Sequence, residues 1–307
     1  MKILLTTGVV LMLAALAGVA SSAAGPPPCF GAASRDPKHP CANPELALQV
    51  IPRPDQIDQE PGVSCKQINK ADEPAVCEFG AARSKAKRTF ALIGDSHVYH
   101  WRATLDVIGN VKRWRGLSIM QGGCYFSEAA GPCVEWYESV LLYLRRHPEV
   151  STIFVTQNAG TPVQPRPGET AQQTKIAAFQ RTWTTRLPKT IRHVVVIRDN
   201  PKSTPDAINC VKDAVAAGVT TPPGPACAIA RKDGLFRDGA ATAAKRLHSS
   251  RYQTIDLTHF FCSSTQCFPV IAGVLVNRDS FGHITLTFAR TLVPYFLRKL
   301  RVLMRRW

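Results

Sequence analysis

The feature that most constrains the fold is an alternation of short apolar runs with helical patterns, which begins near residue 88. Residues 89–93 form the first run, and residues 97 to about 111 follow with Trp101, Leu105 and Ile108 at helical spacing. Further strand-like runs lie at 117–120, 150–156, 192–197 and 252–257, and further helical patterns lie at 134–146, 170–187 and 233–248. Strands that alternate with helices favour a parallel sheet covered on both faces. We therefore predict an α/β, flavodoxin-like three-layer sandwich with a parallel sheet.

The segments around this pattern are of other kinds. Residues 25–87 are dense in Pro and Cys and predict a loop-rich N-terminal extension before a catalytic domain at 88–307. Residues 199–225 have neither period and predict a loop, residues 270–276 predict a hairpin, and residues 284–303 predict a helix interrupted at Pro294. A content of 45% apolar residues supports a packed core and excludes a disordered chain.

The first residues have the pattern of an export signal. Lys2 precedes an apolar run at 3–19, and Ser22, Ala23 and Ala24 are the small residues that a cleavage site needs. We expect residues 1–24 to be a cleaved signal peptide, with a retained membrane anchor as the alternative. The mature protein is then soluble and periplasmic or extracellular, because no later run reaches the roughly 18–20 apolar residues of a membrane span.

The cysteines agree with an oxidising compartment. There are ten of them, and they fall into successive near pairs. The simplest connectivity is sequential, although sequence alone does not fix the pairing: Cys29–Cys41, Cys65–Cys77, Cys124–Cys133, Cys210–Cys227 and Cys262–Cys267. Zinc is the competing interpretation, but no pair has the two-residue gap of a zinc knuckle. We predict a disulfide-braced chain with no metal and no cofactor.

Ser96 is the first candidate for chemistry. It lies in Gly94-Asp95-Ser96-His97, where the first predicted strand turns into a helix. Ligands of parallel sheets bind beyond the carboxyl ends of the strands, and a serine there can present its Oγ to a substrate while its own N–H stabilises an oxyanion. The alternative is that Ser96 only caps the helix.

A second candidate group lies just before the last helix. Asp279 and His283 are close in sequence, so the carboxylate can hold the imidazole while the other ring nitrogen accepts a serine proton. A surface histidine and a turn-forming aspartate are the alternatives. His97 and His100 lack a third metal ligand at useful spacing, so we interpret them as site-lining or surface residues.

The ordered set of motifs resembles the SGNH/GDSL hydrolases, and most of all the SGNH domain associated with membrane acyltransferase-3 proteins. The resemblance covers roughly residues 88–300. It rests on Gly-Asp-Ser-His after the first strand, Gly122-Gly123-Cys124 with Cys133, residues 267–276, and the late Asp279 and His283.

The resemblance implies a role for each matched residue. Ser96 would be the nucleophile, His283 the general base and then acid, and Asp279 the residue that orients the imidazole. The Ser96 amide, the Gly123 amide and the Asn158 side chain would form the oxyanion hole. The alternatives are that Gly123 only supplies a positive φ and that Asn158 only forms a turn. Two matches depart from the family pattern: three residues rather than two separate Asp279 from His283, and Gln157-Asn158-Ala159 replaces Gly-x-Asn-Asp.

The implied function is that of an exported serine esterase or O-acyltransferase that acts through an acyl-Ser96 intermediate on O-acyl groups, most simply acetyl, of envelope carbohydrate. Its partners would be an O-acylated or acylatable glycan and, for a transferase, a membrane acyl donor protein in trans. The longer spacing between Asp279 and His283 keeps a second hypothesis open, in which the chain is a catalytically silent, disulfide-braced module that binds envelope polysaccharide.

The charge adds a further expectation about partners. The net charge is +16, from 38 Lys and Arg against 22 Asp and Glu. Nucleic acid is disfavoured because the chain is predicted to be exported and its cations are mostly scattered. The alternatives are solvated helix faces or attraction to an anionic envelope surface.

Overall fold

The structure is a computed structural model that describes residues 25–129 and 131–307. The predicted signal peptide, residues 1–24, lies outside the described residues. Within the described part of the chain, no helix is both long and apolar enough to cross a membrane.

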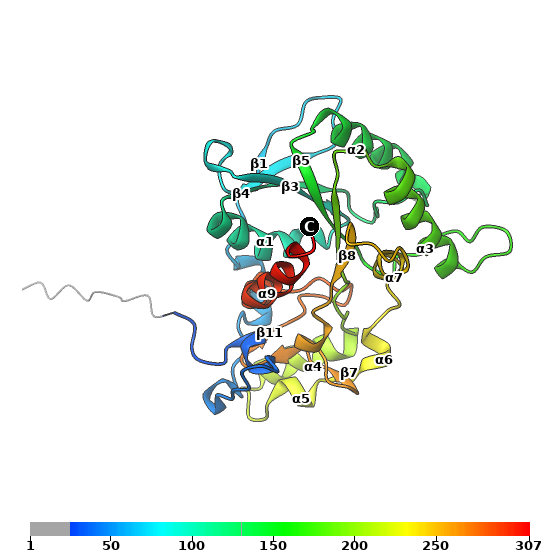
Figure 1. Cartoon of the computed structure of the whole chain (residues 1–307). Helices are drawn as coiled ribbons and strands as arrows, with labels where there is room; N and C mark the ends of the chain where they lie inside the picture. The colour runs from blue at the N-terminus through cyan, green and yellow to red at the C-terminus, as the bar shows by residue number, and fades with distance from the viewer. Residues whose placement is uncertain (1–24, 130) are drawn as a thin grey trace, which may run out of the picture.

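A seven-stranded sheet forms the centre of the fold (Figure 1). Its members are β1 (Lys66–Gln67), β2 (Val76–Gly80), β3 (Arg88–Gly94), β4 (Trp114–Met120), β5 (Val150–Thr156), β6 (His193–Ile197) and β8 (Tyr252–Ile255). Their order across the sheet is β1-β2-β4-β3-β5-β6-β8, and the strands from β4 to β8 are parallel. Counted along the chain, these parallel strands have the flavodoxin-like order 2-1-3-4-5. The predicted α/β sandwich is confirmed, with an antiparallel edge of β1 and β2 added to it.

Helices cover both faces of this sheet. They are α1 (Val98–Lys112), α8 (Leu286–Thr291) and α9 (Val293–Met304) on one face, and α2 (Val134–Arg146), α3 (Ala171–Arg181) and α7 (Gly239–Arg246) on the other. Side chains of a strand alternate between faces, so Phe90 and Leu92 of β3 pack toward the first group while Ala91 and Ile93 pack toward the second. The π-helix η6 (Thr182–Arg186) continues α3.

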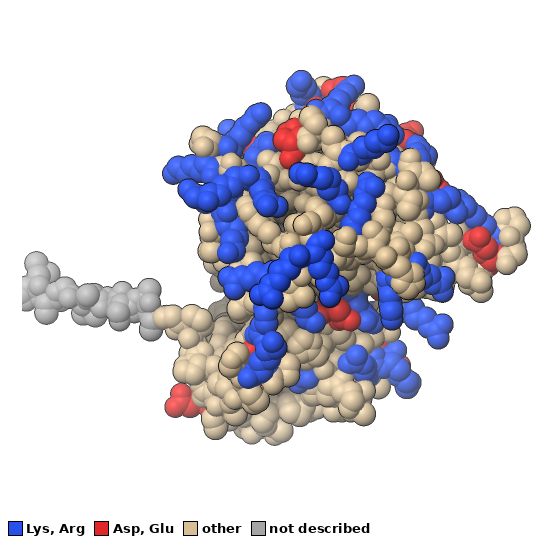
Figure 2. Space-filling view, in the orientation of Figure 1, with Lys and Arg blue, Asp and Glu red and all other residues tan. Residues whose placement is uncertain are grey.

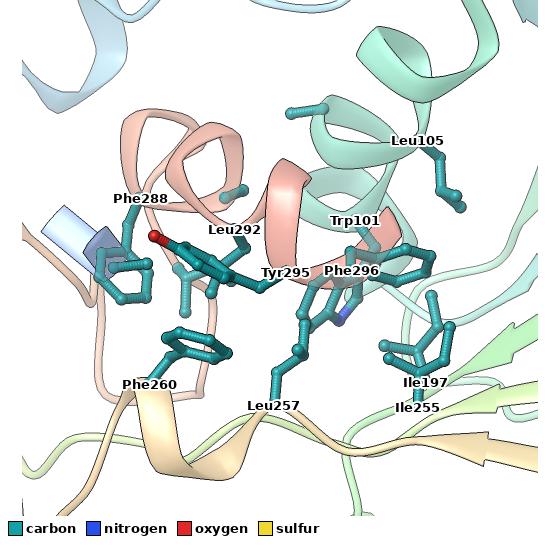
Figure 3. Close-up of a cluster of buried hydrophobic side chains, with 14 of the residues drawn as sticks. Trp101, Leu105, Ile197, Ile255, Leu257, Phe260, Phe288, Leu292, Tyr295 and Phe296 are labelled. Atoms are coloured by element: carbon teal, nitrogen blue, oxygen red, sulfur yellow. The ribbon is translucent and has the colours of Figure 1, made fainter. Parts of the chain in front are cut away.

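The core under α1 and α9 fixes the start of α1 relative to the end of the chain (Figure 3). Trp101 of α1 and Phe296 of α9 are both fully buried, and their ring centroids lie 6.1 Å apart. Ile197 and Ile255, at the ends of β6 and β8, lie below them in the same cluster. The segments that follow Ser96 and His283 therefore pack in one core although they are far apart in sequence.

The Pro- and Cys-rich segment packs against these same helices. It forms the 3-10 helices η1 (Gly31–Arg35), η2 (Pro44–Leu46), η3 (Pro54–Gln59) and η4 (Arg83–Lys85) besides β1 and β2. Arg298 of α9 donates two hydrogen bonds to Asp36, at 3.0 and 2.6 Å. The Glu60 carboxylate accepts the N–H groups of Leu286 and Thr287 at the start of α8, at 3.0 and 2.7 Å. The extension thus braces the helices that follow His283.

All ten cysteines form disulfides, and the pairing is the sequential one: Cys29–Cys41, Cys65–Cys77, Cys124–Cys133, Cys210–Cys227 and Cys262–Cys267. Cys65–Cys77 joins the start of β1 to β2 and so secures the antiparallel edge.

The loop prediction for residues 199–225 was wrong. They contain α4 (Pro205–Ala216) and the short α5 (Pro223–Ala226). The Thr204 side chain accepts the N–H of Ala207 at 3.2 Å, Pro205 occupies the first turn, and Val211 and Val215 are buried. The Pro-rich run at 222–225 had outweighed this helix-start signal.

Three other regions complete the fold. The helix predicted at 233–248 is divided into α6 (Arg231–Gly234) and α7, because Asp238 caps α7 by accepting the N–H of Ala241 at 2.9 Å. The hairpin predicted at 270–276 consists of β10 (Val270–Ile271) and β11 (Val274–Leu275), and β7 (Ile229–Ala230) pairs with β9 (Gln266–Cys267). The 3-10 helices η5 (Gly131–Cys133) and η7 (Thr258–Phe260) lie in connections, and the last helix is broken between α8 and α9.

Candidate active site

Ser96 follows the carboxyl end of β3, the first strand of the parallel set along the chain. The residue at the N-cap of α1 is His97, and no side chain caps that helix. Ser96 Oγ instead lies 2.7 Å from Nε2 of His283. The Ser96 side chain therefore contacts His283 and does not cap α1.

Gly94 allows β3 and β5 to approach each other just before this turn. Its φ is +157°, and a β-carbon there would collide with the carbonyl oxygen of Thr156 on β5. The sequence Gly-Asp-Ser thus has a backbone requirement at its first position, separate from any chemistry at Ser96.

We expect Gly94→Ala to lower the free energy of unfolding by about 3 kcal/mol or more, because the clash is with backbone that the sheet holds in place. Gly62→Ala is the matched control, since a β-carbon at Gly62 would meet only the Tyr99 hydroxyl at 3.9 Å. Urea unfolding of the two variants measures the difference. Equal stability of the two would contradict the proposed backbone constraint.

His283 is held between Ser96 and Asp279. Its Nδ1 lies 2.6 Å from Oδ2 of Asp279, while Oδ1 of Asp279 accepts the N–H groups of Phe281 and His283 at 2.9 and 3.2 Å. Gly282, with φ +98°, supplies the left-handed turn between them. The three intervening residues therefore form a tight loop that keeps carboxylate and imidazole in contact.

The electrostatics favour an ionised Asp279. Burial opposes its charge, but the hydrogen bond and charge interaction with His283, together with the two backbone N–H donors, hold the pKa of Asp279 below its usual value. A carboxylate at this position can fix the tautomer of His283 and stabilise the imidazolium.

Gly123 and Asn158 lie in the loops after β4 and β5, the two strands that flank β3. Gly123 has φ +72° and open space where a side chain would be. The Asn158 side chain donates to the Phe281 carbonyl at 3.1 Å and accepts the Gly160 N–H at 2.8 Å. Asn158 therefore links the loop after β5 to the loop that carries His283.

A buried layer of charged residues lies next to Ser96, His283 and Asp279. Oδ1 and Oδ2 of Asp95 accept the N–H groups of His97 and Asn158 at 2.9 and 2.7 Å. Nδ1 of His97 lies 2.8 Å from Oδ1 of Asp199, and Oδ2 of Asp199 accepts the Ala159 N–H at 2.7 Å. These contacts tie the β3, β5 and β6 exits together.

Of the two interpretations of His97 and His100, the surface one was wrong, because each is only 1% exposed. Both rings pack close to His283, with centroids 5.3 and 6.5 Å from it. Burial, then the nearby charges of His97 and His283, lower the pKa of His100 well below its usual value. Sequence reasoning missed Asp199, although its place two residues after a buried strand, like that of Ser96, was a usable signal.

The ion pair of His97 and Asp199 predicts a pH-dependent stability. Burial opposes charge on His97, but the charge and hydrogen bond of Asp199 outweigh it and raise the pKa of His97 to about 9. The folded protein therefore holds a proton that the unfolded chain releases near pH 6.5. The stabilisation is complete below that pH and is lost as the pH rises through about 9.

We expect the unfolding free energy of the wild type, relative to His97→Asn, to fall by up to about 3 kcal/mol between pH 6 and 9.5. Urea titrations at several pH values measure this difference. A wild-type advantage that stays constant or grows with pH would contradict the assignment of the proton to His97.

The layers of the fold and the contacts of Ser96, His283 and Asp279 define a class: a flavodoxin-like α/β protein with a serine–histidine–aspartate row at the carboxyl edge of its sheet. The family is defined by sequence. A family model described as the SGNH domain fused to AT3 domains matches residues 64–298, and the chain belongs to this family. The match begins before β1, so it includes the antiparallel edge.

Among solved structures, the chain is similar to the periplasmic domain of a lipopolysaccharide acetyltransferase from Salmonella ser. Paratyphi A. The TM-score is 0.50 at 14% sequence identity, over 71% of this chain and 85% of that one, and it shows a shared fold. A sequence comparison with curated proteins finds no match.

Proposed function

We propose that the protein is an exported enzyme that hydrolyses or transfers O-acyl groups, most simply acetyl, on envelope carbohydrate through an acyl-Ser96 intermediate. The observation that carries the proposal is the continuous row of short contacts from Ser96 Oγ to His283 and from His283 to Asp279. Membership of the SGNH family supports acyl chemistry on oxygen. The five disulfides support an oxidising compartment such as the periplasm or the exterior.

In the first half-reaction, His283 Nε2 takes the Ser96 proton as Oγ attacks the acyl carbonyl carbon. The tetrahedral intermediate carries its negative charge on the former carbonyl oxygen. We assign the stabilisation of that charge to the Ser96 and Gly123 amides and the Asn158 side chain, each worth about 2.7–4 kcal/mol when well aimed. The intermediate then expels the donor alkoxide, to which His283 gives the proton, and leaves the acyl ester on Ser96.

In the second half-reaction, water or a sugar hydroxyl attacks the acyl-Ser96 ester while His283 removes its proton. Collapse returns that proton to Ser96 Oγ and releases either the free acid or a new sugar ester. A hydrolase needs only water as the acceptor in this step. A transferase uses the sugar hydroxyl as the acceptor and needs a separate acyl donor for the first half-reaction, for which we propose a membrane acyltransferase-3 protein.

The proposal is tested by incubating the purified mature protein with an activated acetyl ester. We expect turnover, and an acetyl adduct that intact-mass and peptide analysis place on Ser96. The absence of both turnover and adduct would overturn the enzyme assignment and would favour the silent polysaccharide-binding module. The longer spacing that kept this second hypothesis open does not separate Asp279 from His283, whose side chains are in contact at 2.6 Å.

A further inference from the structure

A large groove lies beside β8, between α7 and the end of α9. Its volume is about 960 Å³, and it holds neither Ser96 nor His283. Tyr252, Gln253 and Thr254 of β8 line one side of it, and Leu303 and Arg306 at the end of the chain line another. None of the steps proposed above uses this space.

Four exposed cations line the groove. Arg237, Lys245, Arg246 and Arg306 are exposed and form no ion pair within residues 25–129 and 131–307. Figure 2 shows Lys and Arg gathered over α9 and around it, with few Asp and Glu among them. A concave surface lined by one sign of charge concentrates ligands of the opposite sign.

The acidic residues of the groove are already engaged. Asp256 accepts a hydrogen bond from Arg198 at 2.8 Å. Asp238 accepts the N–H groups of Ala241 and Asp199, both at 2.9 Å. Because Asp256 is ion-paired and Asp238 is buried, the unpaired exposed charge that faces the groove is positive.

The groove continues toward the candidate active site. A second hollow of about 310 Å³ shares Gln172 and Arg237 with it and is walled by Ala159 and Gly160, which directly follow Asn158. The Phe236 ring closes this hollow against Gly160, where a β-carbon would lie 3.0 Å from it. The two hollows thus lead from the cations on α7 to the loop after β5.

Two exposed aromatic side chains lie near this path: Phe236 lines the second hollow, and Phe281 lies outside both hollows in the loop that Asn158 contacts. Phe236 is 41% exposed, and Phe281, whose carbonyl accepts the hydrogen bond from Asn158, is 70% exposed. The ammonium of Lys202 lies 4.4 Å from the centre of the Phe236 ring and adds a further cation. Exposed aromatic rings offer apolar faces to a ligand, and guanidinium groups pair with carboxylate or phosphate in a bidentate manner.

We propose that this groove binds an extended glycan whose sugars carry carboxylate or phosphate groups, and that it leads the chain to Ser96. The proposal rests on the proposed function, because that function makes Ser96 the reactive group toward which the glycan is led. It names the substrate class of that site as anionic glycan. The cations hold the acidic groups, and Phe236 and Phe281 contact sugar faces nearer the site.

Binding is measured in the Ser96→Ala background, so that the result does not depend on turnover. The probes are polygalacturonate for carboxylate, phosphomannan for phosphate and dextran as the neutral glycan. The groove variant is Arg237→Gln/Lys245→Gln/Arg246→Gln. The control variant is Arg83→Gln/Lys85→Gln/Lys87→Gln, which removes the same charge from exposed residues before β3, at the opposite end of the sheet from Ser96.

We expect at least one anionic glycan to bind much more tightly than dextran, with affinity that falls as salt rises. The groove variant should lose about tenfold in affinity, and the control variant less than about twofold. Phe236→Ala, added to the groove variant, should weaken binding beyond the loss in the groove variant alone, because it removes aromatic surface rather than charge.

Equal losses in the two triple variants would overturn the proposal and leave only a diffuse charge effect. Dextran binding as tight as that of the anionic glycans would overturn it too. A groove variant that loses affinity for phosphatidylglycerol vesicles but not for either anionic glycan would assign the groove to lipid instead. The result of the acetyl-ester assay does not depend on any of these binding outcomes, because that assay contains no glycan. Failure of the groove proposal and failure of the proposed function can therefore be told apart.

Discussion

Replacing Ser96 with alanine is expected to lower kcat for an activated acetyl ester by about 10⁴- to 10⁶-fold and to abolish the acyl adduct. The reason is that Ser96 Oγ is the atom aligned with His283 Nε2, at 2.7 Å, so its removal leaves the base with only water to activate. Initial rates with the purified variant, together with intact-mass analysis, measure both effects.

The control is Ser280→Ala, in the loop that carries His283 but without a side-chain hydrogen bond among the described residues. It should change kcat by less than about twofold. The Ser96→Ala/His283→Ala double variant should be no slower than either single variant, because groups that act as one unit are not additive. Residual turnover above about a tenth of wild type in Ser96→Ala would remove Ser96 from the role of nucleophile.

Asp279→Asn is expected to lower kcat by about 10⁴-fold with little change in KM. Asp279 accepts from Nδ1 of His283, whereas an asparagine amide can donate to that nitrogen and leave a proton on Nε2, facing Ser96. The base would then be in the wrong tautomer although the loop is intact. Steady-state kinetics measure kcat and KM separately.

The matched control for Asp279→Asn is Asp58→Asn. Asp58 is 91% exposed and contacts the same loop from outside, through a 2.8 Å ion pair with Arg278. Its neutralisation should leave kcat within about twofold. A loss below tenfold in Asp279→Asn would show that His283 acts without this carboxylate. The three-residue separation of Asp279 from His283 would then mark a real functional difference from the family pattern.

Local signals in the sequence were sufficient to predict the framework. The apolar run that ends at Gly94-Asp95-Ser96 predicted β3, the turn and α1, and the successive near pairs of cysteines predicted the sequential disulfides. These features depend on a few neighbouring residues. The alternation of strands and helices predicted the parallel sheet and the helices on both of its faces.

What the sequence left open depends on contacts over long separations. His97 and Asp199 are 102 residues apart and meet only because β3, β5 and β6 are adjacent. The edge strand β2 is short and begins just after Pro74, and it pairs with β4, which comes only after β3 and α1 in the chain. α4 was missed for a different reason: its cap at Thr204 and Pro205 was present, but the proline run beyond it dominated the pattern.

The separation of Ser96 from His283 also bears on when the protein becomes reactive. The two residues are 187 positions apart, and the segment after His283 is held by α8 and α9 in the core around Trp101. Under the proposed export, the chain would emerge amino end first and present Ser96 before His283 and the final helices have followed. We therefore expect Ser96 to gain its base, and with it the proposed reactivity, only once α8 and α9 have docked at the end of folding.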